Sequence, residues 1–276
     1  MKGCPLSCWW CHNPEGIDQE ISLISDPKAC IDCFACVEAC PHNALAKGGD
    51  AILRDDVRCE TCCTCVDTCP ALSHQTTGWI ASVDTIMEEV LKDKPFYEQT
   101  GGGVTVSGGE PLLQADFLLA VLEACGKENI HRTLDTSAYA SQETLTRLSP
   151  HIDLWLVDLK HMDSEIHKRN TGIGNELILK NIQSLSEQGA NMRLRIPLIP
   201  GVNDSGIALT AMAQFISSLK VQPPIDILPY HDTARGKYEK LQLSYASPGV
   251  ESLGRMDTTM AQKIFLGYGI STHIGG

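Results

Sequence analysis

Strand-like and helix-like patterns alternate through the last 199 positions, residues 78–276, of this chain. Short apolar runs predict strands, and apolar residues recurring every three or four positions predict helices. The expected strands lie at 104–106, 132–135, 153–159, 192–196 and 225–228; the expected helices lie at 83–91 after an N-cap at Ser82, and at 112–127, 141–149, 175–188 and 206–219. This alternation predicts an α/β fold with a mostly parallel sheet covered by helices, and a ligand site at the carboxyl ends of the strands.

Composition narrows the class of protein. The chain is 43% apolar and 20% charged, as expected for a globular protein with a full core. A net charge of -12 without a stripe of Lys and Arg argues against nucleic acid as a partner. No apolar run reaches the roughly 18 to 20 residues of a membrane span, and the N-terminus does not read as a signal peptide. We therefore expect a cytoplasmic protein that binds neither nucleic acid nor membranes.

The thirteen cysteines are concentrated near the N-terminus, and all but Cys125 lie between Cys4 and Cys69. Disulfide frameworks belong to short exported chains, so this cluster indicates metal binding. The sequence divides into residues 1–23 with the first cysteine group, residues 24–77 with the rest, and residues 78–276 with the predicted strands and helices. Residues 24–77, here called the cysteine-rich segment, are expected to be an insert.

The first group, Cys4-x3-Cys8-x2-Cys11, has no fourth cysteine nearby. Three thiolates on a [4Fe-4S] cluster leave one iron open, and an open coordination position distinguishes a reactive metal site from a closed structural one. Zinc is the alternative, with His12 as the fourth ligand.

The run from Lys2 to Glu15, KGCPLSCWWCHNPE, resembles the cluster motif of radical S-adenosylmethionine enzymes, and its Trp-Cys-His-Asn part resembles the glycyl-radical-enzyme activating enzymes. The resemblance implies that S-adenosylmethionine chelates the open iron and is cleaved reductively to methionine and a 5′-deoxyadenosyl radical, which takes a hydrogen atom from a glycine of a partner enzyme. It also implies that Trp10, Cys11 and His12 lie against the cofactor.

The same resemblance implies an open, partial (β/α)6-type barrel. Relatives carry a first strand and an Asp-Gly-Pro-Gly loop before the cysteine motif, whereas this sequence begins at the motif. We therefore expect a barrel without its first strand and with an exposed sheet edge.

Two further cysteine runs, each ending in Cys-Pro, match the bacterial ferredoxin pattern, in which the fourth cysteine ligates the other cluster. They predict two more [4Fe-4S] clusters, one on Cys30, Cys33, Cys36 and Cys69 and the other on Cys59, Cys62, Cys65 and Cys40. Cys63 is expected to be a free thiol. The two clusters either relay electrons to the cluster on Cys4, Cys8 and Cys11 or stabilise a segment that is too small to form its own apolar core. Both roles stay open.

Polar groups follow the predicted strands. Gly108, Gly109 and Glu110 resemble the family's Gly-Gly-Glu segment, which holds the amino group of S-adenosylmethionine. The later segments resemble those lining the cofactor's carboxylate and ribose and a monovalent cation, although Ser137 replaces the usual Asn; they are Asp135-Thr136-Ser137 and Asp158-Leu159-Lys160. By the same resemblance Arg195 contacts cofactor or substrate, and His231 lies near the adenine.

The expected function is therefore that of an activase. Its partner would be a glycyl radical enzyme, either like pyruvate formate-lyase (formate C-acetyltransferase) or like the diol, choline, isethionate and aromatic enzymes, and its reductant a flavodoxin or ferredoxin. We expect a monomer whose clusters bleach in air. Two alternatives stay open: a ferredoxin-type electron carrier, and a radical S-adenosylmethionine enzyme that acts on a small molecule.

Overall fold

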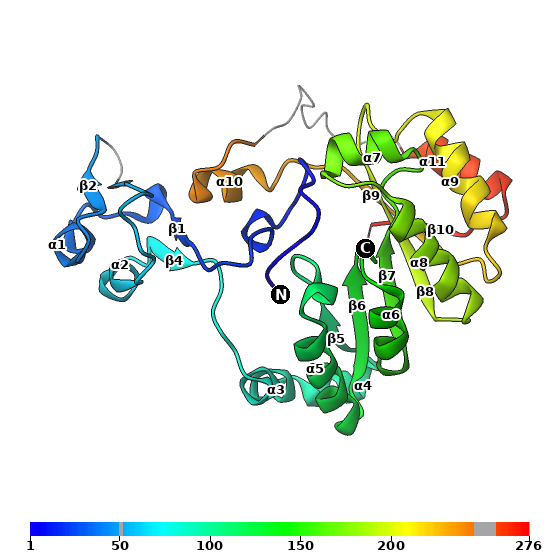
Figure 1. Cartoon of the computed structure of the whole chain (residues 1–276), viewed down its shortest axis with the longest axis horizontal. Helices are drawn as coiled ribbons and strands as arrows, with labels where there is room; N and C mark the ends of the chain where they lie inside the picture. Colours follow the sequence, from blue (N-terminus) through cyan, green and yellow to red (C-terminus); the bar gives the residue numbers. More distant parts are fainter. Residues whose placement is uncertain (50–51, 246–257, 276) are drawn as a thin grey trace.

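The computed structural model describes residues 1–49, 52–245 and 258–275. Its main sheet has six strands in the order β10-β9-β8-β7-β6-β5, and every neighbouring pair is parallel, which confirms the predicted parallel sheet (Figure 1). The strands are β5 (Gly103–Val106), β6 (His131–Thr136), β7 (Leu154–Asp158), β8 (Met192–Leu198), β9 (Ile225–Pro229) and β10 (Thr272–Ile274). Within the described residues β5 is an edge strand and pairs with β6 alone.

Helices cover one face of this sheet and form its core. Apolar side chains of the strands pack in one buried cluster with side chains from α5 (Ala115–Lys127), α6 (Gln142–Leu148), α8 (Glu176–Glu187), α9 (Gly206–Ser218) and α11 (Thr259–Gly267). Short 3-10 turns, η3 (Pro111–Gln114) and η4 (Ser149–His151), precede α5 and follow α6. The predicted helices at 112–127, 141–149, 175–188 and 206–219 are therefore confirmed.

The predicted N-cap at Ser82 is also confirmed. Its side chain accepts a hydrogen bond from the backbone N–H of Thr85 at 3.1 Å, and α3 (Val83–Lys92) begins at the next residue. Met87 of this helix packs against Val121 and Cys125 of α5, so α3 adds a second, smaller apolar cluster beside the edge strand β5.

The two faces of the sheet differ in burial more than the sequence suggests. The apolar run Leu154–Val157 predicts a strand buried on both faces, but Trp155 and Val157 are fully buried whereas Leu154, Leu156 and Asp158 are half-buried. The prediction is wrong here because only one face packs against helices. The other face carries charged residues, and Arg195 on β8 is the register partner of both Asp158 on β7 and Asp226 on β9.

Several short elements have too few residues to give a periodic signal. The pattern missed α4 (Lys94–Thr100), α7 (Ser164–Thr171), α10 (Arg235–Leu241), α11 and β10. The pattern predicts no element after the strand at 225–228, but β10 extends the sheet beside β9, and Phe265 of α11 is fully buried in the main core.

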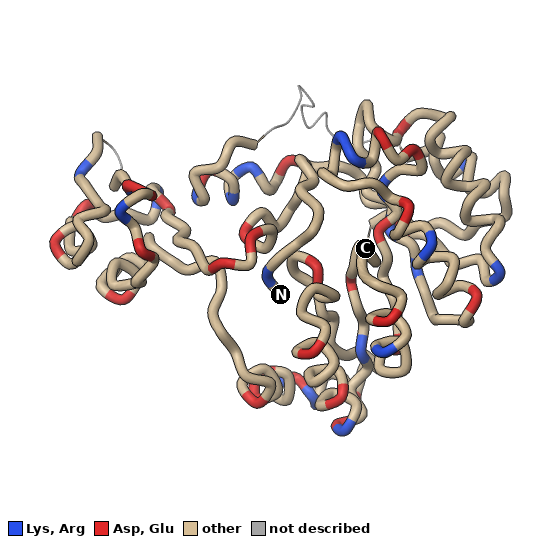
Figure 2. The backbone as a smooth tube through the Cα atoms, viewed as in Figure 1, with Lys and Arg blue, Asp and Glu red and all other residues tan. Residues whose placement is uncertain are grey.

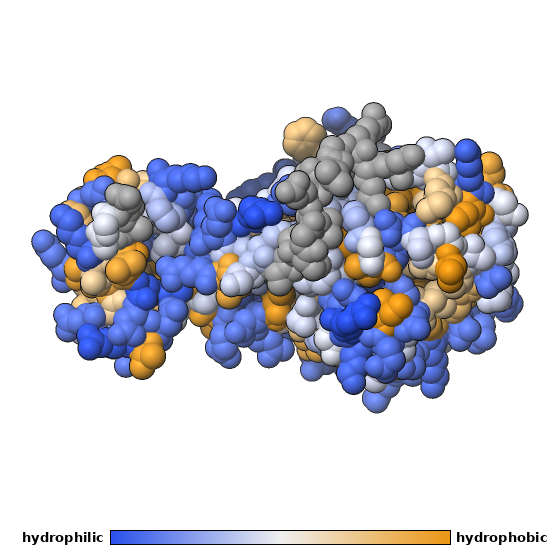
Figure 3. Space-filling model, turned by 90° about the horizontal axis from the view of Figure 1, so that it is seen from above, coloured by the Kyte–Doolittle hydropathy of each residue, from blue (hydrophilic) through white to orange (hydrophobic). Residues whose placement is uncertain are grey.

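The cysteine-rich segment forms a lobe of its own beside the sheet (Figures 1 and 3). Its ends pair as an antiparallel ribbon of β1 (Leu23–Ser25) and β4 (His74–Thr76). Between them lie η2 (Pro27–Ala29), α1 (Ala35–Ala39), α2 (Thr64–Thr68) and a second ribbon of β2 (Leu45–Lys47) and β3 (Ile52–Arg54). The apolar core of this lobe is small, and two of its five buried residues are the cysteines Cys36 and Cys65.

Charges of both signs are spread over the main body and the lobe (Figure 2). Among the helices in the part of the chain that the structure describes, none combines the length and the apolar character needed to cross a membrane.

Candidate active site

Residues 3–17, here called the three-cysteine loop, form a closed loop. Backbone hydrogen bonds from Gly3 N to Gly16 O (2.8 Å) and from Cys4 N to Ile17 O (2.9 Å) join its two ends, and η1 (Pro14–Gly16) completes the return. Cys11 N donates to Cys8 O at 3.0 Å, which folds the two cysteines into one turn. The three predicted cluster cysteines are thus held in a single compact segment.

The far side of this loop is anchored to the end of α7. Ser7 N donates to Thr171 O at 2.7 Å, and the Trp9 indole N–H donates to the Asn170 side-chain oxygen at 3.0 Å. Gly172 follows with φ +88°, and a Cβ there would lie 2.6 Å from Ser7 Oγ. A glycine at this C-cap therefore allows α7 and the loop to touch.

The Gly108–Glu110 turn packs directly against the three-cysteine loop. Gly109 N donates to Met1 O at 2.7 Å, and Glu110 N donates to Gly3 O at 2.6 Å. A Cβ on Gly109 would overlap the carbonyl oxygens of Gly3 and Gly16. The resemblance assigns Gly108 and Gly109 to the amino group of S-adenosylmethionine; their nearest neighbours in the structure are backbone atoms of Met1, Gly3 and Gly16.

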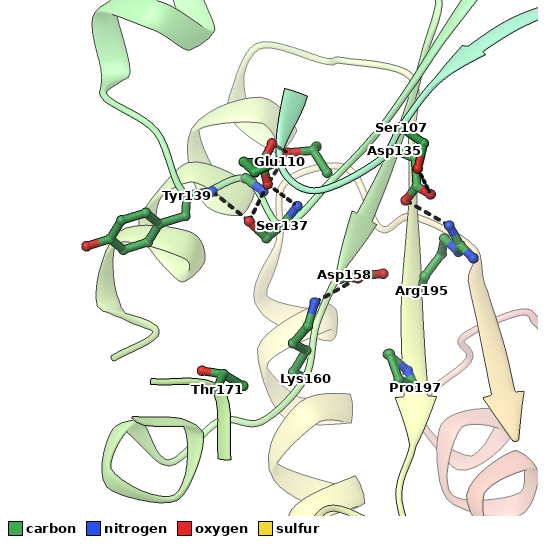
Figure 4. A network of polar contacts seen from close by, with 12 residues as sticks. Ser107, Glu110, Asp135, Ser137, Tyr139, Asp158, Lys160, Thr171, Arg195 and Pro197 are labelled. Carbon is green, nitrogen blue, oxygen red and sulfur yellow. Dashed lines mark hydrogen bonds and ion pairs between the residues drawn. The ribbon is translucent and has the colours of Figure 1, made fainter. Parts of the chain in front are cut away.

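Glu110 fastens this turn to the end of β6. Its fully buried carboxylate accepts hydrogen bonds from Thr136 Oγ1 (2.6 Å), Ser137 N (2.8 Å) and Leu112 N (3.2 Å), and from the Ser137 hydroxyl (Figure 4). Burial raises the pKa of Glu110, and the hydrogen bonds from Ser137 and Thr136 act in the opposite direction. The carboxylate is thus used to join two loops that the sequence assigned to the cofactor.

A row of charges crosses the carboxyl ends of β6 and β7 and the middle of β8. Arg195 pairs with Asp135 at 2.8 Å, Ser107 Oγ donates to Asp135 at 3.0 Å, and Lys160 pairs with Asp158 at 2.7 Å (Figure 4). Burial raises the pKa of Asp135, and the neighbouring Asp158 raises it further. The Nε of Arg195 is buried and has no hydrogen-bond partner among the described residues. A buried donor without a partner is costly, and a ligand carboxylate would satisfy it.

Lys160 connects this charged row to the cysteines. Burial opposes its charge, but Asp158 and the thiolate forms of Cys8 and Cys4 outweigh that effect and raise the pKa of Lys160. Burial raises the pKa of Cys8 to about 12, and Lys160 acts in the opposite direction. Since iron binds thiolates, cluster assembly must release these protons, and the lysine would then neutralise part of the cluster's negative charge. Donor set and environment therefore fit a [4Fe-4S] cluster.

The aromatic end of the three-cysteine loop meets the end of β9. Trp10 is buried against Ile199 and Tyr230, and the rings of His12 and His231 lie 4.2 Å apart. His12 Nε2 is also 3.1 Å from the backbone oxygen of His231. Burial lowers the pKa of His12, and the neighbouring imidazole lowers it further. The two histidines that the sequence assigned to the cofactor are thus neighbours.

One predicted contact residue has its side chain elsewhere. Leu159 is buried in the main apolar core, and its backbone N–H donates to Arg195 O at 2.8 Å. Only its main chain faces the charged row.

The two cysteine runs together line two hollows in the cysteine-rich segment. Three cysteines of one run and the last cysteine of the other line each hollow: Cys30, Cys33, Cys36 and Cys69 line the first, and Cys59, Cys62, Cys65 and Cys40 line the second. Cys63 also lines the second hollow and donates to Thr61 O at 3.2 Å. In the described residues, no three metal-binding side chains converge on a point suited to one ion; the thiols instead surround a volume.

Three buried or half-buried asparagines position the site and were not predicted. Asn170 holds Trp9, as described above. Asn203 binds the backbone oxygens of Lys160 (2.8 Å) and Pro197 (2.7 Å) and accepts from Ile199 N (2.7 Å). Asn181 donates to two oxygens of the loop after β6, both at 2.8 Å. A signal existed only for Asn181, which occupies an apolar position of its helix beside Ile178 and Ile182.

Comparison with known proteins agrees with this geometry. The profile described as "Radical SAM superfamily" matches residues 1–212. The trans-4-hydroxy-L-proline dehydratase activating enzyme of Clostridioides difficile is 41% identical over 100% of this chain and 92% of its own length. The choline trimethylamine-lyase activating enzyme of Oleidesulfovibrio alaskensis is 38% identical over 93% of this chain and 85% of its own length.

A solved structure is also similar. It is a domain of a pyruvate-formate lyase-activating enzyme from Bacteroides vulgatus, with a TM-score of 0.53 and 39% identity over 63% of this chain and 99% of that one. The chain therefore belongs to the radical SAM superfamily and, within it, to the glycyl-radical-enzyme activating enzymes.

Proposed function

We propose that this chain cleaves S-adenosylmethionine reductively and uses the resulting 5′-deoxyadenosyl radical to remove a hydrogen atom from a glycine of a partner enzyme. The observation that carries the proposal is the docking of the three-cysteine loop onto the Gly108–Glu110 turn, above the charged strand ends. Cys4, Cys8 and Cys11 would hold a [4Fe-4S] cluster there, which supplies one electron to the sulfonium.

The surrounding residues are proposed to bind the rest of S-adenosylmethionine. The unpartnered Nε of Arg195 and the ammonium of Lys160 suit its carboxylate, because both are cationic donors in the charged row. The His12–His231 pair and the buried Trp10 form an aromatic wall suited to the adenine. A monovalent cation beside Asp135 and Asp158 is part of the proposal, although both carboxylates are already paired with protein cations.

The test is an anaerobic assay of the reconstituted protein with dithionite and S-adenosylmethionine. We expect 5′-deoxyadenosine and methionine in equal amounts, and none from a Cys8→Ala variant. A Cys125→Ala variant is the matched control, because Cys125 is buried between α3 and α5 in the second apolar cluster. Clusters with normal absorbance but no product would contradict the proposal and favour the electron-carrier alternative.

We further propose that the cysteine-rich segment is a ferredoxin-like insert in an open partial barrel and that it holds two more [4Fe-4S] clusters. Support comes from the two hollows, each lined by three cysteines of one run and one of the other. In each half a residue with left-handed backbone precedes the short helix, Phe34 before α1 and Cys63 before α2, so the halves repeat the same local fold. Iron and sulfide near twelve atoms each per chain would fit three clusters.

The protein partner is proposed to be a glycyl radical enzyme of the kinds that the relatives activate, with the hydroxyproline dehydratase and choline lyase types first. A flavodoxin or ferredoxin is proposed as the reductant, and a monomer as the working form. The test is electron paramagnetic resonance (EPR) after incubation with each candidate enzyme. A glycyl radical doublet with one candidate and not with the others would identify the partner; no doublet with any glycyl radical enzyme, from a chain that cleaves S-adenosylmethionine, would favour a small-molecule substrate.

A further inference from the structure

Helix α10 lies between the three-cysteine loop and the cysteine-rich segment (Figure 1). Lys237 Nζ is 2.9 Å from Asn13 Oδ1 and 2.6 Å from Glu15 Oε1. One turn further along, Lys240 Nζ is 2.8 Å from Asp26 Oδ2, at the start of the cysteine-rich segment. Two lysines of one short helix thus bind two different parts of the chain, and neither is used by the proposed reaction.

Aromatic packing fixes α10 independently of these lysines. Tyr238 is buried and its ring lies 4.8 Å from that of Tyr245, whose hydroxyl is 2.7 Å from the Tyr230 hydroxyl. Tyr230 in turn packs against Trp9 and Trp10 of the three-cysteine loop. Loss of a lysine should therefore leave the helix in place.

The carboxylate that Lys237 binds is in an unusual position. Glu15 Oε2 is buried and accepts no hydrogen bond within the described residues. Glu15 stands four residues after Cys11, where the closed three-cysteine loop returns, so the Glu15–Lys237 ion pair belongs to the same compact segment as the three cysteines. Lys2 also reaches this residue, but at its backbone oxygen. In a partly buried setting an uncompensated carboxylate acts strongly on nearby charges.

We propose that Lys237 is a positioning residue that neutralises Glu15 and thereby keeps the cluster on Cys4, Cys8 and Cys11 reducible. Negative charge beside an iron–sulfur cluster disfavours adding an electron, since net charge is one determinant of the reduction potential. Lys237 also ties the return of the three-cysteine loop to the segment that carries His231, so one side chain links the reducing and adenine-binding ends of the site. The inference rests on the proposed function.

The test compares four variants of the full, reconstituted chain: Lys237→Met, Glu15→Gln, their double variant, and Lys240→Met as the matched control from the same helix. The readout is the midpoint potential of the EPR signal that changes when S-adenosylmethionine is added, which separates this cluster from any in the cysteine-rich segment. Lys237→Met should shift the potential to more negative values and Glu15→Gln to more positive ones. The double variant should return close to the wild-type potential, and Lys240→Met should equal wild type.

A purely structural role predicts a different pattern. Lys237→Met would then lose iron without a shift of potential in the cluster that is retained, and the double variant would not recover. If Lys237→Met retains too little iron for its midpoint potential to be measured, Lys237→Arg takes its place. This variant keeps the positive charge, so its midpoint potential should equal that of the wild type. No shift in Glu15→Gln, or equal shifts in Lys237→Met and Lys240→Met, would overturn the inference. Wild-type protein without an S-adenosylmethionine-sensitive signal would instead contradict the proposed function, so the two failures are distinct.

Discussion

Ser137 holds the buried carboxylate of Glu110 through both its backbone N–H and its hydroxyl. Ser137 stands where the family resemblance leads one to expect Asn. A short hydroxyl side chain lets the carboxylate lie against the backbone at the end of β6. The turn after β5 and the loop after β6 are therefore fixed to each other by hydrogen bonds within the protein.

This arrangement makes Glu110 sensitive to loss of an acceptor. In Glu110→Gln the amide nitrogen replaces an oxygen that accepts hydrogen bonds, so it faces backbone N–H groups that also donate. Leaving such a buried donor unpaired costs about 1–3 kcal/mol, and we expect a matching fall in the free energy of unfolding of the variant. Thermal or denaturant unfolding under anaerobic conditions measures it. The exposed Glu123→Gln on α5 is the control, and equal losses in both variants would contradict the assignment.

Gly109 is expected to tolerate no side chain. In Gly109→Ala the new Cβ overlaps the Gly3 and Gly16 oxygens, so the three-cysteine loop must move away. Such overpacking costs about 1–3 kcal/mol, and the displaced loop should bind S-adenosylmethionine more weakly. Equilibrium dialysis measures the binding. Gly206→Ala is the control because a Cβ there meets nothing within 4 Å. Unchanged binding in Gly109→Ala would show that the close contact is not needed.

Arg195 should affect stability and binding separately. Arg195→Met leaves Asp135 without its cationic partner beside Asp158, which costs stability. It also removes the proposed donor to the cofactor carboxylate. Adding Asp135→Asn should recover much of the free energy of unfolding but not the affinity for S-adenosylmethionine. Recovery of both in the double variant would limit Arg195 to a structural role.

In the proposed arrangement each of the two clusters of the cysteine-rich segment takes its fourth cysteine from the other run, which predicts how cysteine variants change the iron content. Cys69→Ala should remove the cluster proposed for Cys30, Cys33 and Cys36 and lower the iron content from about twelve to about eight atoms per chain. Cys63→Ala should leave the iron content unchanged, although Cys63 lines the second hollow. Iron and sulfide analysis of purified, reconstituted protein decides. Loss of iron in Cys63→Ala would make that thiol a ligand.

The sequence was sufficient for features that local pattern controls. Ser82 caps its helix. Asp135 and Asp158 stand at the carboxyl ends of β6 and β7, and the two carboxylates are neighbours because parallel strands end at one edge of the sheet. It was insufficient where distant segments meet. Nothing near Lys237 indicates that it binds residues more than 220 positions earlier, and nothing near Asn170 indicates Trp9. The charged face of β7 was missed because its apolar residues alone do not show which side lacks a helix.

The ends of the cysteine-rich segment lie side by side. Leu23 pairs with Thr76, and Ser22 and Thr77 are hydrogen-bonded just outside that pair. Because the segment begins and ends at neighbouring positions, it has the geometry of an insertion into a surface loop. Joining Ser22 to Thr77 would leave the neighbouring chain path nearly unchanged. A single insertion or deletion of genetic material can therefore add or remove the whole lobe, so the cysteine-rich segment can evolve independently of the radical chemistry in the main body.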